Sequence, residues 1–224
     1  MSPTDQPAAL ADAPHLSARR LADLASRATG SEPRGSSADD ASDAGDADPR
    51  IDVFAPATTE RIGSVPACAA TDVADAADRA RAAQGEWAET PATERAAVID
   101  RFGDLVIDRR EELLDLLQLE TGKSRTTAVE ELFDVPTGCT YLADEAPSAL
   151  AEERRRGVVP GLTTATVTYE PVGVVGVISP WNYPLTLSMA DALPALAAGN
   201  AIVIKPDEKT PYGALALGEL LEVA

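Results

Sequence analysis

The chain has 224 residues, 45% of them hydrophobic, and a formal net charge of -18 at pH 7. This hydrophobic content is sufficient for a buried core in one or two domains. The negative charge argues against nucleic acid and anionic membranes as partners, because both bind through clustered Lys and Arg. The widely spread Asp and Glu and the scarcity of lysine favour a halophile-like protein kept soluble in a high-salt cytoplasm, although an acidic mesophilic protein would share this composition.

Cysteine and histidine usage limits the chemistry that the chain can support. Cys68 and Cys139 provide no disulfide framework and the sequence has no secretory leader, so we predict a reducing, cytoplasmic location. The single histidine, His15, leaves a His/Cys metal site almost without ligands, and we predict no metal. No apolar stretch reaches the roughly 18 residues of a membrane-spanning helix.

Residues 1–50 are rich in Ala, Asp, Ser, Pro and Gly. The run from Gly30 to Asp48 contains no large apolar residue and cannot bury enough surface to offset its chain entropy. Leucine spacing allows a short helix from Leu16 to Ala28. We nevertheless predict that residues 1–50 form an acidic, mostly disordered extension, which either aids solubility or is merely tolerated.

Residues 51–157 are predicted to form a small hairpin followed by helices. Apolar alternation from Ile51 to Phe54 and a return from Arg61 to Val65 indicate two paired strands. Apolar residues at helical spacing predict helices at 71–84, 91–107, 111–120 and 126–150. The small residues of the first helix predict close packing, and a proline in the last predicts a bend.

Residues 158–171 are predicted to form one strand. The segment from Thr163 to Tyr169 is rich in Thr and Val, which favours an extended conformation, and its half-polar pattern is typical of a sheet edge. Edge strands that must be covered often lie at contacts between subunits.

Residues 172–224 alternate between strands and helices. Runs at 172–178 and 201–204 are apolar throughout, as is typical of parallel strands buried on both faces, and 185–197 and 211–223 have helical patterns. This β-α-β-α order predicts an α/β fold that comprises the opening half of a doubly wound, Rossmann-like sheet.

Two polar turns follow these strands, at the position where ligands of doubly wound folds bind. Ser179 to Pro184 follows the first strand, and Lys205 to Glu208 follows the second, but the G-x-G-x-x-G phosphate fingerprint is absent. From the pattern alone, Lys205 and Glu208 could bind ribose hydroxyls or be solvated charges. Asn182 could stabilise an oxyanion or cap the following helix.

The segment at 172–211, VGVVGVISPWNYPLTLSMADALPALAAGNAIVIKPDEKTP, resembles the aldehyde dehydrogenase superfamily. That family has the same strand, Pro-Trp-Asn-(Phe/Tyr)-Pro corner, helix end and Lys-Pro-x-Glu turn in this order. Shorter matches at 55–58, 94–95 and 119–123 extend the resemblance over residues 51–224. The amino-acid sequence from 160 to 205 most resembles that of succinate-semialdehyde dehydrogenases.

The resemblance implies a role for the residues of the first turn. Asn182 would supply a side-chain amide to an oxyanion hole. Ser179 and Trp181 would line the nicotinamide side of the cofactor cleft.

The second turn would bind the other end of the cofactor. Lys205 and Glu208 would contact the adenosine ribose, with Pro206 and Asp207 shaping the turn. A carboxylate at Glu208 would repel a 2′-phosphate, which favours NAD, while Lys209 keeps NADP open.

The resemblance also implies an activity and an assembly. The reaction would oxidise a small aldehyde to a carboxylic acid with NAD(P)+ and water. The strand at 163–169 would be part of an oligomerisation arm in a homodimer or homotetramer.

Two residues that this reaction requires are not recognisable. The family mechanism needs a nucleophilic cysteine and a glutamate that activates water. The family's Gly-Gln-x-Cys and Glu-Leu-Gly-Gly motifs do not occur, and neither Cys68 nor Cys139 lies in a matching context. We therefore predict that the catalytic domain is absent and that the chain alone is inactive. The alternatives are a non-catalytic nucleotide-binding or subunit-interaction module and the product of a truncated reading frame.

Overall fold

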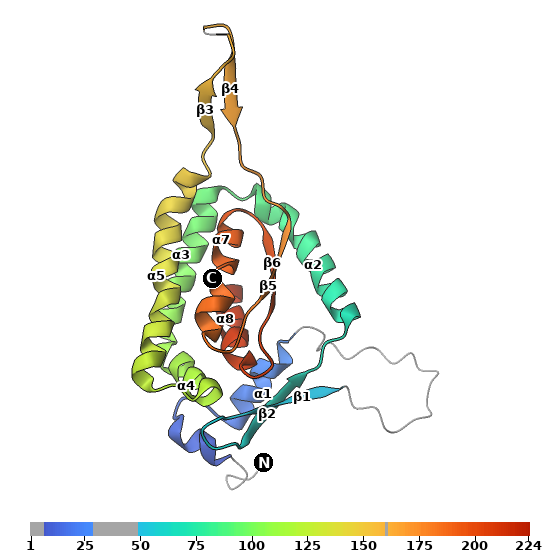
Figure 1. Cartoon of the computed structure of the whole chain (residues 1–224), viewed down its shortest axis with the longest axis vertical. Coiled ribbons are helices and arrows are strands. Elements are labelled where there is room, and N and C mark those ends of the chain that lie inside the picture. The colour runs from blue at the N-terminus through green and yellow to red at the C-terminus, as the bar shows by residue number, and fades with distance from the viewer. Residues whose placement is uncertain (1–6, 29–48, 160) are drawn as a thin grey trace, which may run out of the picture.

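The computed structural model describes residues 7–28, 49–159 and 161–224. Helices surround a parallel strand pair, one hairpin lies at the end that carries the N-terminal helices, and a second hairpin projects from the opposite end (Figure 1). The elements, in chain order, are η2 (Ala8–Asp12), α1 (Ala18–Ser26), β1 (Arg50–Phe54), β2 (Arg61–Pro66), α2 (Ala70–Glu89), α3 (Ala92–Asp108), α4 (Arg110–Thr121), α5 (Arg125–Ala149), β3 (Glu153–Arg156), β4 (Thr164–Val167), β5 (Val174–Ile178), α6 (Pro184–Met189), α7 (Ala192–Ala197), β6 (Ala201–Lys205) and α8 (Pro211–Val223).

The N-terminal segment is folded at residues 7–28, where α1 corresponds to the short helix that the leucine spacing allowed. The Ser17 side chain caps α1 by accepting a hydrogen bond of 3.1 Å from the Arg20 backbone N–H. Leu21 and Leu24 of α1 are fully buried in the main core cluster. A few leucines on one face therefore suffice, because the rest of the chain supplies the surface that they pack against. The acidic run from Gly30 to Asp48 lies outside the described residues.

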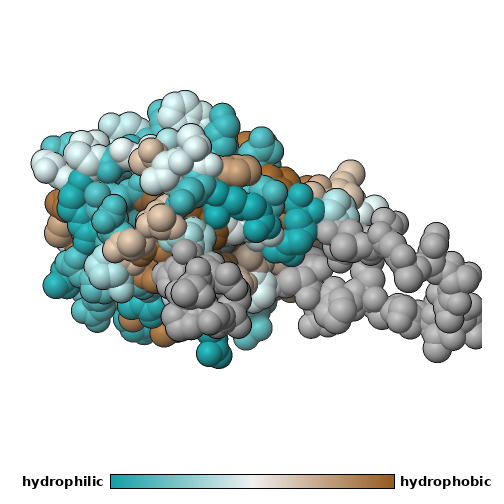
Figure 2. Space-filling model, turned by 90° about the horizontal axis from the view of Figure 1, so that it is seen from below, coloured by the Kyte–Doolittle hydropathy of each residue, from teal (hydrophilic) through white to brown (hydrophobic). Residues whose placement is uncertain are grey.

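Ion pairs join α1 to two helices that are distant in sequence. The Arg20 guanidinium lies 2.5 Å from the Glu112 carboxylate of α4 and 2.8 Å from the Glu219 carboxylate of α8. All three side chains are largely shielded from solvent, with exposed fractions of 20%, 12% and 15%. Figure 2 views the molecule from this end, where hydrophilic residues predominate and hydrophobic ones form small patches.

The predicted hairpin at 51–65 is confirmed, whereas the helix after it differs from its prediction. β1 and β2 pair antiparallel, with Ile51 opposite Val65. α2 is longer than predicted, and Ala76, Ala77 and Ala80 of its predicted small-residue face are half-buried rather than buried. The helix contacts β5 and β6, and the Trp87 indole N–H attaches it to the end of α7 by donating to the Leu196 carbonyl over 2.9 Å.

Helices α3, α4 and α5 lie together on one side of the molecule, and α6, α7 and α8 pack against them (Figure 1). Gly103 lies where an added Cβ would come within 2.9 Å of Cys139 Cβ, so α3 and α5 approach closely there. α4 ends at Gly122, whose φ of 71° is in the left-handed region that glycine tolerates. α5 continues through Pro136 and Pro147 as one helix.

The projecting hairpin contains two strands where one was predicted. β3, the charged segment before position 157, pairs antiparallel with β4, with Glu153 opposite Val167. The predicted boundary at 157/158 was therefore wrong, because it divides a hairpin. A ribbon surrounded by solvent needs no apolar face, so β3 lacks the alternation by which strands are recognised. Val158 and Leu162, between the strands, are 97% and 83% exposed.

The parallel pair and the order of its elements agree with the predicted β-α-β-α unit. β5 and β6 run parallel in register from Val174 opposite Ala201 to Ile178 opposite Lys205. The strands are not buried on both faces as predicted, since Ile178 is 81% exposed. The predicted helix at 185–197 is divided into α6 and α7, and Pro194, which has no N–H to donate to the preceding turn, lies in the second piece.

Asn200 holds the start of β5 against the end of α7. Its side-chain oxygen accepts a hydrogen bond of 2.9 Å from the Gly173 N–H, and its side-chain nitrogen donates to the Ala195 carbonyl over 3.0 Å. Gly199, just before it, has a φ of 86° that lets the chain reverse into β6. These contacts set the register that places the two polar turns.

Candidate functional site

The two predicted turns begin side by side at the carboxyl ends of β5 and β6. The Ser179 backbone N–H donates to the Lys205 carbonyl over 3.1 Å, one step beyond the last paired residues of the strands. The chain therefore brings the Pro-Trp-Asn corner and the Lys-Pro-Asp-Glu turn to one edge of the sheet, as the sequence predicted.

Residues from both turns line one surface cavity. The cavity has a volume of about 470 Å³ and is closed on its other side by β1 and the end of α4. The Trp181 side chain is 53% exposed, and the Lys209 ammonium lies 5.8 Å from the centre of its ring. The residues around the cavity are Ile51, Asp52, Phe54, Pro56, Glu120, Thr121, Trp181, Glu208, Lys209 and Thr210.

Asn182 presents its carboxamide to solvent. The residue is exposed, and it has no hydrogen-bond partner within the described part of the chain. It does not cap α6, because the cap position is Tyr183 and no side-chain capping bond forms there. The helix-cap alternative for Asn182 is thus wrong, and its amide is available to an external acceptor.

Ser179 does not lie where the resemblance implied. The residue is 3% exposed, and its hydroxyl lies 2.9 Å from the Ser188 hydroxyl in the interior. Along β5 and its continuation, side chains alternate between the two faces, and Val177 and Ser179 share the buried face. A side chain that is buried and hydrogen-bonded in this way cannot line a cofactor cleft, so this assignment is corrected.

The second turn is ordered by its aspartate. An Asp207 carboxylate oxygen accepts from the Lys209 backbone N–H over 3.0 Å, and its carbonyl accepts from the Thr210 N–H over 3.1 Å. This is the local bonding by which Asp favours turns. Pro206 before it is half-buried, whereas Lys205 and Glu208 are exposed. The turn thus leaves one cation and one anion accessible at the same edge of the sheet.

Two buried glutamates lie behind the turns, and sequence reasoning missed both. Glu120, which is 3% exposed, accepts hydrogen bonds from the N–H groups of Tyr212 and Gly213 over 2.6 and 2.9 Å. Burial raises the pKa of Glu120 to about 8, although these two hydrogen bonds oppose the shift. Glu131, which is 1% exposed, accepts from the Leu185 N–H over 2.9 Å. The sequence signal that could have identified these two glutamates is an acidic residue among the apolar positions of a helix.

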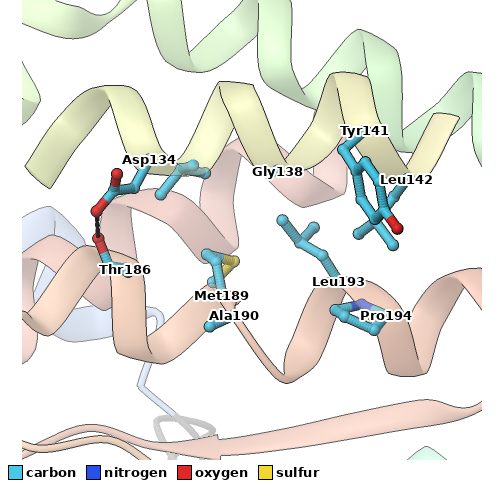
Figure 3. Close-up of a pocket in the computed structure, with 10 residues that line it drawn as sticks. Asp134, Gly138, Tyr141, Leu142, Thr186, Met189, Ala190, Leu193 and Pro194 are labelled. Carbon is cyan, nitrogen blue, oxygen red and sulfur yellow. Dashed lines mark hydrogen bonds between the residues drawn. The ribbon is translucent and has the colours of Figure 1, made fainter. Parts of the chain in front are cut away.

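A second cavity lies between α5 and the pair α6 and α7 (Figure 3). Its volume is about 250 Å³, and Asp134 and Thr186 share a hydrogen bond of 3.2 Å at one end. Carbon-rich side chains such as Met189 and Leu193 form most of its wall (Figure 3). Its lining, as far as the structure describes it, includes no Lys or Arg, so it supplies no counter-charge for an anionic ligand.

Neither cysteine has the environment of an activated thiol. Cys139 is fully buried in α5, and burial raises its pKa to about 12. Partial burial also raises the pKa of Cys68. A nucleophilic cysteine requires a lowered pKa, so these environments oppose thiolate formation at both residues.

Two further classes of feature were searched for over the described ranges. Within 7–28, 49–159 and 161–224, no group of three or more His, Cys, Asp or Glu could hold a metal ion. No helix within these ranges has both the length and the apolar content needed to cross a bilayer.

The model of the aldehyde dehydrogenase family matches residues 43–224. A relative from Mycobacterium tuberculosis (strain ATCC 25618 / H37Rv), named "Putative succinate-semialdehyde dehydrogenase [NADP(+)] 2", is 51% identical over 164 residues, which are 73% of this chain and 32% of the relative. N-succinylglutamate 5-semialdehyde dehydrogenase 1 from Caulobacter vibrioides is 39% identical over 169 residues, 75% of this chain and 35% of the relative. The chain thus spans about a third of the length of these relatives.

Crystal structures of two dehydrogenases have the same fold over most of the chain. Succinate-semialdehyde dehydrogenase from Burkholderia pseudomallei is 37% identical with a TM-score of 0.75, and the match covers 80% of this chain and 36% of that one. An NAD-dependent benzaldehyde dehydrogenase from Corynebacterium glutamicum is 36% identical with a TM-score of 0.73, covering 80% and 39%. These matches confirm the predicted N-terminal, Rossmann-like part of the fold. The chain belongs to the aldehyde dehydrogenase family.

Proposed function

We propose that this chain forms the nicotinamide-dinucleotide-binding part of an aldehyde dehydrogenase. The proposed substrate is a small aldehyde such as succinate semialdehyde. The observation that carries the proposal is the 3.1 Å hydrogen bond from Ser179 N–H to the Lys205 carbonyl. It places two turns of different chemistry, one amide-bearing and one charged, at the same edge of a parallel sheet, where doubly wound folds bind ligands. The names of the relatives support the choice of substrate class.

The residues present fit a nicotinamide dinucleotide. Lys205 and Glu208 are accessible and could donate to and accept from ribose hydroxyls. The half-exposed ring of Trp181 offers an apolar surface on the same cavity as Glu208. When bound, the dinucleotide would accept a hydride from the substrate. Asn182, whose amide has no partner in the described structure, would donate to the oxyanion that forms at the aldehyde oxygen.

NAD is the proposed cofactor, with NADP as the alternative. The carboxylate of Glu208 would repel a 2′-phosphate, and the adjacent Lys209 ammonium is directed toward the Trp181 ring. The relatives differ in the cofactor for which they are named. The mycobacterial protein carries NADP(+) in its name, whereas the Corynebacterium enzyme is described as NAD-dependent. Titration of the chain with each dinucleotide tests the proposal. We expect tighter binding of NAD+ and, in Glu208→Gln, a gain in relative affinity for NADP+.

The chain by itself is proposed to be inactive. Neither Gly-Gln-x-Cys nor Glu-Leu-Gly-Gly occurs in its 224 residues, and both cysteines have raised pKa values. NAD+ or NADP+ reduction followed with succinate semialdehyde and other short aldehydes tests this directly. Measurable turnover by the purified chain would refute it.

The projecting hairpin is proposed to mediate self-association in the cytoplasm. Apart from the half-buried Glu153, the residues of its strands are exposed, and β4 has an edge that pairs with no other described strand. Exposed Val158 and Leu162 add an apolar tip that a second copy of the chain would cover.

A further inference from the structure

Both turns of the functional site are followed by a helix that begins with proline and lacks a side-chain cap of its own. α6 begins at Pro184 and α8 at Pro211, and the residues before them, Tyr183 and Thr210, form no side-chain capping bond. The first N–H groups of a helix have no acceptor within the helix and need one from outside. In both helices, a buried carboxylate from the α4–α5 layer is that acceptor.

Glu131 holds the corner that contains Asn182 from two sides. One carboxylate oxygen accepts from the Leu185 N–H over 2.9 Å, at the start of α6. The other contacts the Lys123 ammonium, which lies 4.0 Å from the centre of the Tyr183 ring. The residues on the C-terminal side of Asn182 are therefore fixed both through the backbone and through a side chain.

A third contact attaches the same corner to α5. The Thr186 hydroxyl lies 3.2 Å from both the Glu131 carbonyl and the Asp134 carboxylate of α5, and its single hydrogen is shared between these two acceptors. Burying a carboxylate is costly unless it is paired and hydrogen-bonded, and Glu131 is both. The buried Glu131 carboxylate therefore serves to order the corner.

Glu120 performs the same task at the second turn. Its two oxygens accept from the N–H groups of Tyr212 and Gly213, at the start of α8. The two glutamates act on different segments, because Glu131 contacts residues 185–186 and Glu120 contacts residues 212–213. Each can therefore serve as the control for the other.

We propose that Glu131, paired with Lys123, is a positioning residue that fixes the Asn182 carboxamide at the edge of the sheet. The inference rests on the proposed function, in which Asn182 donates to the oxyanion. Glu131 itself touches no reacting atom in this scheme. Its effect is to reduce the number of orientations that the corner would otherwise sample, since a donor contributes most when it is held in place beforehand.

Hydrogen exchange measured by mass spectrometry on the full chain tests the proposal. We compare wild type with Glu131→Ala, Glu131→Gln and Glu120→Ala, following peptides that cover residues 182–187 and 206–213. In Glu131→Ala we expect exchange at 182–187 to accelerate by about tenfold or more, with 206–213 within about twofold of wild type. Glu120→Ala should show the opposite pattern. Glu131→Gln keeps an acceptor for Leu185 but not the charge for Lys123, and should be intermediate.

A general loss of stability would accelerate exchange in both segments, so equal effects of Glu131→Ala on the two would overturn the proposal, as would no effect at 182–187. If Glu131→Ala fails to fold, Glu131→Gln and Lys123→Met provide the same comparison with the same criterion. NAD+ titration of wild type tests the proposed function separately. If NAD+ does not bind but Glu131→Ala accelerates exchange only at 182–187, only the proposed function is rejected. If NAD+ binds but Glu131→Ala affects the two segments equally, only the positioning role is rejected.

Discussion

The Glu120 carboxylate accepts a hydrogen bond of 2.6 Å from the backbone N–H of Tyr212, across 92 residues of sequence. This contact joins the end of α4 to the start of α8, the helix that follows the proposed ribose-binding turn. It also buries an ionisable group completely, which gives the protein a measurable pH dependence.

The first prediction concerns this dependence. The pKa of Glu120 is raised from 4.5 to about 8 in the folded protein. The folded state therefore holds the proton more tightly than the unfolded state. The resulting stabilisation is fully present below about pH 4.5 and is lost as the pH rises through about 8, with a slope of up to ~1.4 kcal/mol per pH unit.

Urea unfolding at several values between pH 5 and pH 8 measures this effect. Other groups also titrate, so the informative quantity is the difference between wild type and Glu120→Gln, which lacks the ionisable group. We expect wild type to lose more stability than the variant as the pH increases. Parallel curves for the two proteins would show that Glu120 is not buried as described.

The second prediction concerns the N-terminal helix. Leu24 is 0% exposed in the core cluster, so Leu24→Ala should lower the free energy of unfolding by about 2–5 kcal/mol. Val223→Ala, at a residue of α8 that is 68% exposed, is the control and should change it by less than about 0.5 kcal/mol. If the two substitutions had equal small effects in denaturant unfolding, α1 would not be part of the folded core.

The third prediction concerns a close contact between β2 and α8. A Cβ added at Gly63 would lie 2.1 Å from the Tyr212 hydroxyl oxygen, which is buried and has no hydrogen-bond partner in the described structure. Gly63→Ala should therefore destabilise the protein by about 1–3 kcal/mol. Tyr212→Phe removes an unsatisfied hydroxyl and should be neutral or stabilising. In a double-mutant cycle, Tyr212→Phe should recover part of the loss, and strict additivity would contradict this contact.

The fourth prediction concerns the projecting hairpin. If Val158 and Leu162 contact a second copy of the chain, replacing both with Asp should shift the assembly toward monomer without changing the unfolding midpoint of the monomer. Sedimentation velocity at several concentrations measures this shift. Wild type that remains monomeric at high concentration would argue against the hairpin as a self-association site for this chain.

Some of the fold could be predicted because its signals are local. Strands β5 and β6 follow from apolar β-branched runs, and the turns follow from the Pro-bearing segments at their ends. The break between α6 and α7 was missed although Pro194 is visible in the sequence, because a proline at this position is also compatible with a kinked continuous helix. β3 was missed because a solvated ribbon does not need an apolar face.

Other features depend on contacts between distant residues and have no local signal. The inward position of Ser179 depends on which face of β5 is covered, and that is decided by α6 and its Ser188. The roles of Glu120 and Glu131 likewise depend on helices that lie 92 and 54 residues further along the chain. α1 was underestimated because its leucines are too few to form a core by themselves, and the surface that they cover belongs to other helices.

The central claim, that this chain binds a nicotinamide dinucleotide between its two turns, is tested most directly by calorimetric titration with NAD+. Wild type should bind saturably, Glu208→Ala should weaken binding by about tenfold, the usual effect of losing one hydrogen bond to a charged group, and Glu86→Ala on exposed α2 should bind as wild type does. Absence of saturable binding, or equal affinities for all three proteins, would contradict the claim.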